Sequence, residues 1–227
     1  MHVHRPFNRE NVTQINVKRY TDGWMANIGV NLEAAEAGPA VDAAVGIDVG
    51  LSTFAALSDE TKVDNPRHLR RAEKRLRRAQ RRLSRKERGS CNRQKAKRKV
   101  AKIHQKVARQ RKDFLHKQSY RTVRDHDLIA VEQLNVKNMI RNRRLSKSIS
   151  DAGWRKFITY LSYKVERQGK RFVQVPAHGT SQTCVCGAEV PKTLAIRLHK
   201  CEGCGLVQDR DIVSAKIILQ RALKMIA

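Results

Sequence analysis

Alternating apolar and polar positions near the N-terminus predict a β-hairpin. Residues 12–30 contain two alternating runs, and Asp22-Gly23, a dipeptide typical of tight hairpin turns, lies between them. Residues 41–49 and 53–57 are more continuously apolar and predict a second pair of strands. The segment between the two pairs, residues 31–40, contains a Gly-Pro step and is expected to be a linker.

A helical pattern replaces the alternation after Pro66. In two consecutive segments, apolar residues recur every three or four positions, and the polar sequence Gly-Ser-Cys-Asn at 89–92 separates the segments. This pattern predicts two helices joined by a short turn, which together form an antiparallel helical hairpin. The apolar positions are Leu69, Ala72, Leu76, Ala79, Leu83, Ala96, Val100, Ile103 and Val107.

Short apolar runs and helical patterns follow each other in the C-terminal half. Residues 127–134 and 172–175 predict strands. Residues 151–168 place their large apolar side chains at helical spacing, which is typical of a helix that packs on a core. Residues 211–225 predict a final helix.

Positive charge is the strongest feature of the composition. The formal net charge is +27, and residues 67–117 contribute +20 of it, with 23 Lys and Arg against 3 Asp and Glu. Solvated helix surfaces normally carry both signs of charge, so we expect this segment to contact phosphates. A ribosomal-type RNA-binding protein or a basic protein at a membrane surface would show a similar excess. The side chains assigned to nucleic-acid binding are Arg70, Arg71, Lys74, Arg77, Arg78, Arg81, Arg82, Arg85, Lys97, Arg98, Lys102 and Arg109.

Length and hydrophobic content indicate a folded chain. The protein has 227 residues, and 40% of them are hydrophobic, which excludes full disorder. The sequence has no run of about 18 apolar residues, and its first residues lack the apolar core of a signal peptide. We therefore expect no membrane partner and a cytoplasmic, nucleoid-associated protein.

Four of the five cysteines form two close pairs. Cys184 and Cys186 make the first pair, and Cys201 and Cys204 make the second. In a cytosolic chain this pairing favours a zinc site over disulfides, because tetrahedral Zn²⁺ is commonly held by four thiolates. His178 or His199 could replace a thiolate, and the alternative is a site that has lost its metal; the remaining cysteine, Cys91, is expected to be a free thiol.

Three acidic residues stand on three separate predicted elements. Asp48 lies in an apolar strand, Glu132 ends another strand, and Asp211 opens the last helix. Taken singly they could be a turn residue, a strand-end charge and a helix N-cap. Together, carboxylates from separate elements suit Mg²⁺ or Mn²⁺. Two such ions about 3.5–4 Å apart would activate water and stabilise the leaving oxygen in phosphodiester hydrolysis.

The sequences around these residues resemble a known family. "GIDVGLSTFAALSDE", "IAVEQLNVKNM" and the segment from "TSQTC" to "CEGCGLVQDRD" resemble the three parts of the RuvC-like nuclease of TnpB proteins. These are the OrfB proteins of IS200/IS605-type insertion sequences, which are related to Cas12 effectors. "RRAEKRLRRAQRRLSRKERGS" is similar to the basic helical insertion of that family, and "DAGWRKF" to its following helix.

The resemblance implies an α/β fold of the RNase H-like (RuvC) type with a mixed sheet, a basic antiparallel helical hairpin insertion and a zinc-ribbon insertion. It implies a metal-dependent DNA endonuclease that uses Mg²⁺ or Mn²⁺ at Asp48, Glu132 and Asp211 and Zn²⁺ at the four paired cysteines. DNA and a guide RNA are the implied partners. The alternative is a catalytically idle accessory protein, or a truncated remnant, that binds DNA or guide RNA.

The implied domain organisation has four parts. Residues 1–40 are a hairpin and linker left from an N-terminal barrel, residues 66–117 the basic hairpin, and residues 178–208 the zinc ribbon. The nuclease core comprises residues 41–65, 118–177 and 209–227.

The sequence departs from the family pattern at three places. The first cysteine pair is C-x-C, where the family has C-x₂-C, so the turn that holds the sulfurs is expected to differ. Val213 and Ile217 stand where the family usually has asparagines, so any support those amides give Asp211 is absent. Only about 40 residues precede the Asp48 strand, so we expect a full-length family member or a separate N-terminal half as a further partner.

Overall fold

The computed structural model describes residues 6–31, 41–193 and 196–226. These residues fall into two compact units, the first within Met1–Ala34 and Leu69–Gln110, the second within Ala35–His68 and Arg111–Ala227. Within the described ranges, no helix has the length and apolarity that crossing a membrane requires.

The first unit begins with a short 3-10 helix, Arg9–Asn11, and the predicted β-hairpin of β1 (Val12–Tyr20) and β2 (Gly23–Val30). Its turn differs from the prediction by one residue. Tyr20 pairs with Gly23, so the two turn residues are Thr21 and Asp22. Gly23, with φ of +143°, begins β2, and supplies the positive φ that other residues rarely adopt.

The hairpin turn is bonded to a helix of the same unit. The Asp22 carboxylate accepts hydrogen bonds from Gln105 and from both terminal nitrogens of Arg109. Gln105 also accepts from the Thr21 backbone N–H at 3.1 Å. A two-stranded hairpin is marginally stable alone, so these contacts help to fix it.

The two predicted basic helices are present as α1 (His68–Ser84) and α2 (Cys91–Asp125). Cys91 is exposed and is the first residue of α2, whereas the sequence placed it in the preceding turn. The apolar seam is confirmed: Ala79, Ile103 and Val107 are buried, and the six other seam residues are partly buried. Helix α2 is longer than the seam and contributes its last 15 residues, 111–125, to the second unit.

A five-stranded mixed sheet organises the second unit. Its order is β5-β4-β3-β6-β7. Strands β3 (Ala44–Val49), β4 (Thr53–Leu57) and β5 (Lys62–Asp64) are antiparallel neighbours, while β6 (Leu128–Gln133) and β7 (Arg171–Pro176) run parallel to β3. The sequence analysis did not anticipate β5, because its three residues include a single apolar side chain.

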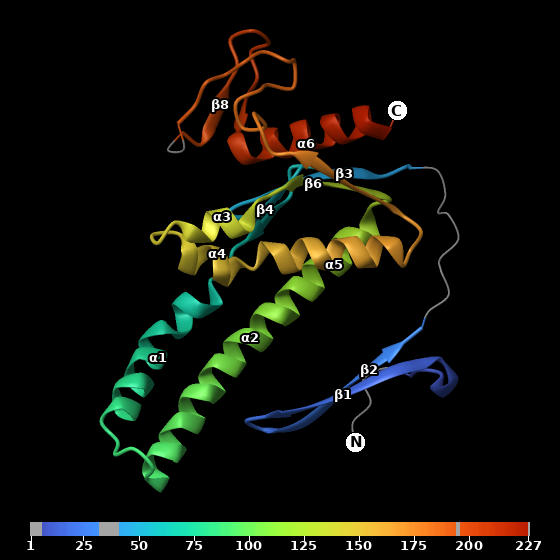
Figure 1. The fold of residues 1–227 in the computed structure, drawn as a ribbon. Helices are drawn as coiled ribbons and strands as arrows, with labels where there is room; N and C mark the ends of the chain where they lie inside the picture. The colour runs from blue at the N-terminus through green and yellow to red at the C-terminus, as the bar shows by residue number, and fades with distance from the viewer. Residues whose placement is uncertain (1–5, 32–40, 194–195, 227) are drawn as a thin grey trace. The chain divides into compact units, whose positions relative to one another are not determined.

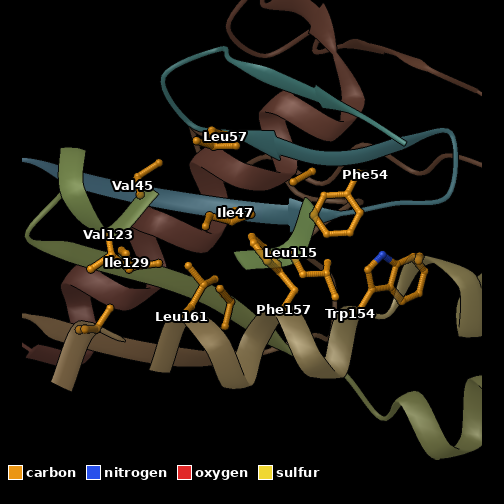
Figure 2. Close-up of a cluster of buried hydrophobic side chains, with 14 of the residues drawn as sticks. Val45, Ile47, Phe54, Leu57, Leu115, Val123, Ile129, Trp154, Phe157 and Leu161 are labelled. Carbon is orange, nitrogen blue, oxygen red and sulfur yellow. The ribbon is translucent and has the colours of Figure 1, made fainter. Parts of the chain in front are cut away.

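Helices cover both faces of this sheet (Figure 1). Helix α5 (Trp154–Glu166) and the end of α2 pack on one face, where Val45, Ile47 and Phe157 belong to the main buried cluster (Figure 2). Helix α6 (Arg210–Ile226) packs on the other face, against a smaller cluster that includes Leu128 and Ala130. Successive strand residues therefore point alternately to α5 and to α6.

Gly46 brings α6 very close to the sheet. A Cβ atom at this position would lie 2.1 Å from the Ala215 carbonyl oxygen and 2.7 Å from the Leu219 nitrogen. Only a residue without a side chain fits there. The α6 face of β3 is thus identified by Gly46, and by every second residue from it.

Two short helices, α3 (Val136–Arg141) and α4 (Ser146–Ala152), lie between β6 and α5 and were not predicted. The helix predicted over residues 151–168 is interrupted at Gly153. Gly153 has φ of +74° and ends α4, and α5 starts at the next residue. The final helix agrees with its prediction to within one residue at each end.

Candidate metal and nucleic-acid sites

Asp48 and Glu132 are neighbours on adjacent parallel strands. Ile47 of β3 pairs with Val131 of β6, so the next step of the register places Asp48 beside Glu132. Paired residues point to the same face of a sheet, and neighbouring strands are about 4.8 Å apart. Both acids lie near the carboxyl ends of their strands.

The third acid, Asp211, lies in the first turn of α6, on the same face of the sheet. Gly46 points toward α6 at Ala215, and Asp48, two residues later on β3, points to the same side. One helical turn back from Ala215 along α6 is Asp211. Within the part of the chain that the structure describes, the carboxylate oxygens of the three acids do not form a group in which all lie within 4.8 Å of one another. The sulfurs of the cysteines described below do.

The environment disfavours a charged Asp48. Burial, and then the negative charges of Glu132 and Asp211, hold the pKa of the Asp48 carboxyl well above its usual range, against the opposite effect of Arg210 and Arg197. Burial also raises the pKa of Glu132. A carboxylate that is desolvated and surrounded by like charges is stabilised by a cation.

Asp211 is held by two arginines. Its carboxylate oxygens lie 3.3 Å from an Arg197 guanidinium nitrogen and 3.2 Å from one of Arg210. Arg197 also donates to the Ser52 hydroxyl at 3.1 Å. The N-cap role considered for Asp211 is wrong, because the Asp209 carboxylate accepts the Asp211 backbone N–H at 2.9 Å. The turn role considered for Asp48 is likewise wrong, because Asp48 lies within β3.

Glu132 has a buried partner that sequence reasoning missed. The Thr180 hydroxyl, on a residue only 4% exposed, donates a hydrogen bond to the Glu132 carboxylate. This bond acts to lower the pKa of Glu132, against the larger effect of burial. Thr180 stands in the "TSQTC" segment quoted above, so the available signal was its place just after a strand and before the cysteines.

The four paired cysteines converge as predicted. The ligand sulfurs of Cys184, Cys186, Cys201 and Cys204 all lie within 4.8 Å of one another. The closest pairs are Cys184 with Cys204 at 3.6 Å, and Cys186 with Cys201 at 3.7 Å. Tetrahedral Zn²⁺ with sulfurs at about 2.3 Å requires sulfur–sulfur separations of about 3.8 Å. The donor set and its spacing therefore fit a structural zinc ion.

The histidines considered as substitute ligands are not in this group. His199, on β8 (Leu198–Lys200), is fully buried, and its Nδ1 is bonded to the Lys192 ammonium group. The His178 backbone carbonyl accepts a hydrogen bond from Arg221 at 2.6 Å.

The unusual C-x-C pair is accommodated by a tighter turn. In the second pair, which lies between β8 and β9 (Val207–Asp209), the Gly205 N–H donates to the Cys201 carbonyl, four residues back. In the first pair, the Gly187 N–H donates to the Cys184 carbonyl, three residues back. Both glycines have a positive φ, +71° and +91°. The missing residue thus shortens the turn while the sulfurs still converge.

Backbone N–H groups also face the sulfurs. The Cys204 N–H donates to the Cys201 sulfur and is the main reason that the pKa of that thiol is lowered to about 7. Burial raises the pKa of Cys184, although the Cys186 N–H acts in the opposite direction. A thiol that readily deprotonates is suited to metal binding, because the ligand is the thiolate.

All twelve basic residues assigned to nucleic-acid binding are exposed. Within the part of the chain that the structure describes, Arg77 lies 3.5 Å from Glu73, and Arg109 binds Asp22. A groove of about 380 Å³ lies among them, lined by Ala79 and Ala96 and by four cationic side chains. Lys86 and Lys99 of this set are not among the twelve residues assigned from the sequence. The four are Arg82, Arg85, Lys86 and Lys99.

The fold is similar to that of Cas12f proteins. It matches the "Cryo-EM structure of the Cas12f1-sgRNA-target DNA complex" with a TM-score of 0.54, over 90% of this chain and 55% of that chain. It matches the "Cryo-EM structure of CRISPR-Cas12f Ternary Complex" with a TM-score of 0.56, over 90% of this chain and 44% of that chain. Sequence identity is 20% in both cases, so the likeness defines the class of fold.

Sequence comparison identifies the family. Residues 27–143 match OrfB_IS605, described as "Probable transposase", and residues 154–218 match "Cas12f1-like, TNB domain". The chain belongs to the OrfB_IS605 family, that is, to the TnpB proteins.

Two curated relatives carry the name "Putative RNA-guided DNA endonuclease". One, from Streptomyces pristinaespiralis, is 43% identical over 188 residues, which cover 82% of this chain and 46% of the relative. The other, InsQ of Escherichia coli (strain K12), is 32% identical over 225 residues, which cover 92% of this chain and 56% of the relative. The chain thus spans about half the length of the curated relatives it matches.

Proposed function

We propose that the chain is the nuclease portion of a TnpB protein, with an RNase H-like (RuvC) core that hydrolyses DNA phosphodiesters using divalent metal. The single observation that supports this proposal is the placement of Asp48 and Glu132 side by side on the face of the sheet that α6 covers, with Asp211 in the first turn of α6. The names of the two curated relatives, which describe DNA endonucleases, support the same class of reaction.

These residues fit a hard divalent cation. The donor set is carboxylate oxygen, which Mg²⁺ and Mn²⁺ prefer, and the raised pKa of Asp48 reflects a charge that its neighbours leave incompletely compensated. When bound, the metal would supply an activated water and stabilise the leaving oxygen. Asp48, Glu132 and Asp211 would hold it, and the Thr180 hydroxyl would orient the Glu132 carboxylate.

We further propose that the four converging cysteines hold Zn²⁺ in a ribbon over residues 178–208. Its role would be structural, since four protein thiolates leave no open position on a tetrahedral ion. Contacts of this region with α6, such as Gln220 with the Val185 carbonyl at 3.3 Å, would connect zinc binding to the helix that carries Asp211.

The basic helices over residues 66–117 are proposed as an insertion that binds nucleic-acid backbone. Their exposed cations are on the surface of both helices, and the groove lined by Arg82 and Lys99 offers positive charge around a small apolar floor. Phosphate contacts of this kind position a nucleic acid and carry no sequence information. Sequence choice by a guide RNA would be a property of longer relatives, or of this chain with a partner.

A second candidate is a binding protein that does not cut. It is favoured by one observation, the exposed cationic surface of α1 and α2, which suits phosphate contacts whether or not the acids bind metal. Incubation with labelled single-stranded and duplex DNA, in Mg²⁺ or Mn²⁺, separates the two candidates. The nuclease proposal expects metal-dependent products, and the binding proposal expects retention of intact DNA with little response to metal.

A further inference from the structure

We propose that Lys62 and Asp209 are positioning residues, which fix Asp211 for divalent-metal binding. The proposal rests on the proposed function, because it concerns how the same acidic site is assembled. Neither residue is among the predicted catalytic acids. Lys62 lies on β5, at the edge of the sheet, and Asp209 is the last residue of β9, just before α6. Their side chains form an ion pair.

Lys62 belongs to the same row of the sheet as two of the acids. Lys62 pairs with Ala56, and Ala56 pairs with Asp48. The register places Glu132 next in this row, and all of these side chains point to the α6 face. Two strand spacings separate Lys62 from Asp48, about 10 Å. Ala56, which lies between them, is buried, with 1% of its surface exposed.

The Lys62 ammonium group reaches the residue just before α6. Its Nζ lies 2.7 Å from Oδ2 of Asp209. The other oxygen of the same carboxylate, Oδ1, accepts the Asp211 backbone N–H at 2.9 Å. Asp209 therefore connects an edge strand to the backbone of the third acid, with one oxygen for each.

The charge of Asp209 agrees with this arrangement. Its carboxylate faces two donors, the Lys62 ammonium group and the Asp211 N–H, and both stabilise the negative charge. The ionised carboxylate also lies at the positive end of the α6 dipole. The Lys62 ammonium group and the start of α6 thus both favour this placement of the carboxylate.

A second contact acts beside the first. Glu60, in the turn between β4 and β5, accepts from the Lys216 ammonium at 2.9 Å and from the Gln208 amide at 2.7 Å. Glu60 has φ of +72°, a conformation that non-glycine residues adopt rarely. The β4–β5 turn thus holds the residue before Asp209 and the second turn of α6.

These contacts matter because the side chain of Asp211 is engaged elsewhere. Arg197 and Arg210 bind its carboxylate, and the Asp209 bond caps the first turn of α6, in which Asp211 lies. Loss of that bond would let the arginines draw the carboxylate away from Asp48 and Glu132. The expected consequence is weaker metal binding with an intact fold.

The test is Mn²⁺ binding to the zinc-loaded full chain, measured by electron paramagnetic resonance without DNA. We expect Asp209→Ala to weaken Mn²⁺ binding by about tenfold, the scale of residues that orient metal ligands. Asp209→Asn keeps an oxygen for the Asp211 N–H and loses the ion pair, so its effect is expected to be smaller. Lys62→Met is expected to match Asp209→Asn, and Lys62→Arg to restore binding.

Arg124→Gln is the matched control, because it removes an exposed ion pair outside the acidic site. In that pair, Arg124 Nε lies 2.6 Å from Asp125 Oδ1. Thermal unfolding of each variant separates misfolding from repositioning, and Lys62→Met leaves the helix cap in place. Wild-type affinity in Asp209→Ala, while Asp48→Asn abolishes binding, would overturn this inference alone. If Asp48→Asn binds Mn²⁺ as tightly as wild type, the proposed function is overturned, and this inference with it.

Discussion

The Thr180 hydroxyl donates a hydrogen bond to the Glu132 carboxylate, although 48 residues separate them in the sequence. Thr180 is buried, and it follows β7, the strand that pairs with the end of β6 where Glu132 lies. This bond orients a predicted metal ligand and opposes the effect of burial on its pKa. It gives the first prediction.

Thr180→Val is expected to lower metal-dependent cleavage and to shift the acid limb of its pH profile to higher pH. Without the hydroxyl, burial is less opposed, so the pKa of Glu132 rises further and a higher pH is needed to ionise it. The measurement is cleavage rate against pH at saturating Mg²⁺. Thr159→Val, which removes an exposed hydroxyl bonded to the Arg155 carbonyl, is the control and should leave the profile unchanged.

Asp48→Asn is expected to stabilise the protein when Mg²⁺ is absent and zinc is retained. The pKa of Asp48 is raised in the folded state, so this group favours folding below its unfolded pKa of about 4, and that contribution is lost as pH rises through the folded pKa. At neutral pH the amide avoids the cost that the raised pKa represents, because it carries neither a charge to desolvate nor a proton to take up on folding. We expect a rise in melting temperature of about 2–4 °C, corresponding to about 1 kcal/mol.

Calorimetry or circular dichroism at several pH values checks this prediction. The advantage of Asp48→Asn should shrink toward acidic pH, where the wild-type carboxyl is protonated, and also when Mg²⁺ is added at neutral pH. A variant that is less stable than wild type at neutral pH without Mg²⁺ would show that Asp48 makes stabilising contacts instead.

The cysteine cluster predicts about one zinc ion per chain. Cys204→Ser should lower the zinc content, because it removes one of four ligands, whereas Cys91→Ser should not, because Cys91 is exposed on α2 outside the group. Elemental analysis of the purified proteins measures this. Zinc-free wild-type protein that is folded and fully stable would contradict a structural role for the metal.

Substitutions on the basic helices should weaken binding to DNA in a salt-dependent manner. Arg78→Gln together with Arg82→Gln is expected to reduce affinity at low salt and to flatten the slope of log K against log [salt] by about 0.9 for each phosphate that is no longer neutralised. Arg124→Gln with Arg167→Gln removes the same charge elsewhere. Equal slopes for the two double variants would mean that net charge, and not this surface, determines binding.

Much of the fold could be predicted from the sequence, because its local patterns are strong. The alternation over residues 12–30, the seam over 69–107 and the apolar strands around Asp48 and Glu132 all give the elements that the structure contains. The missed elements are short or polar: β5 has one apolar residue, and α3 and α4 have six and seven residues. The break at Gly153 depends on a positive φ that spacing alone does not reveal.

The acids and cysteines of the candidate site could be proposed from the sequence, but the residues that contact them could not. The acids were identified because each interrupts an apolar pattern or belongs to a family motif. Thr180 and Asp209 lie within the quoted family segments and Lys62 lies outside them, but nothing in the sequence connects any of the three to an acid. A threonine after a strand and a Lys–Asp pair 147 residues apart are common in any chain. Strand register and helix placement bring them to the site, and both are tertiary properties.

The most direct test of the central claim is DNA cleavage by Asp48→Ala, measured beside wild type and an Asp42→Ala control, whose acid is exposed just before β3. We predict that wild type and Asp42→Ala cut labelled DNA in Mg²⁺ or Mn²⁺, and that Asp48→Ala does not. Asp48→Ala should bind DNA at least as tightly as wild type, because a charge that repels phosphate is removed. Cleavage by Asp48→Ala at the wild-type rate would contradict the assignment of the acidic site.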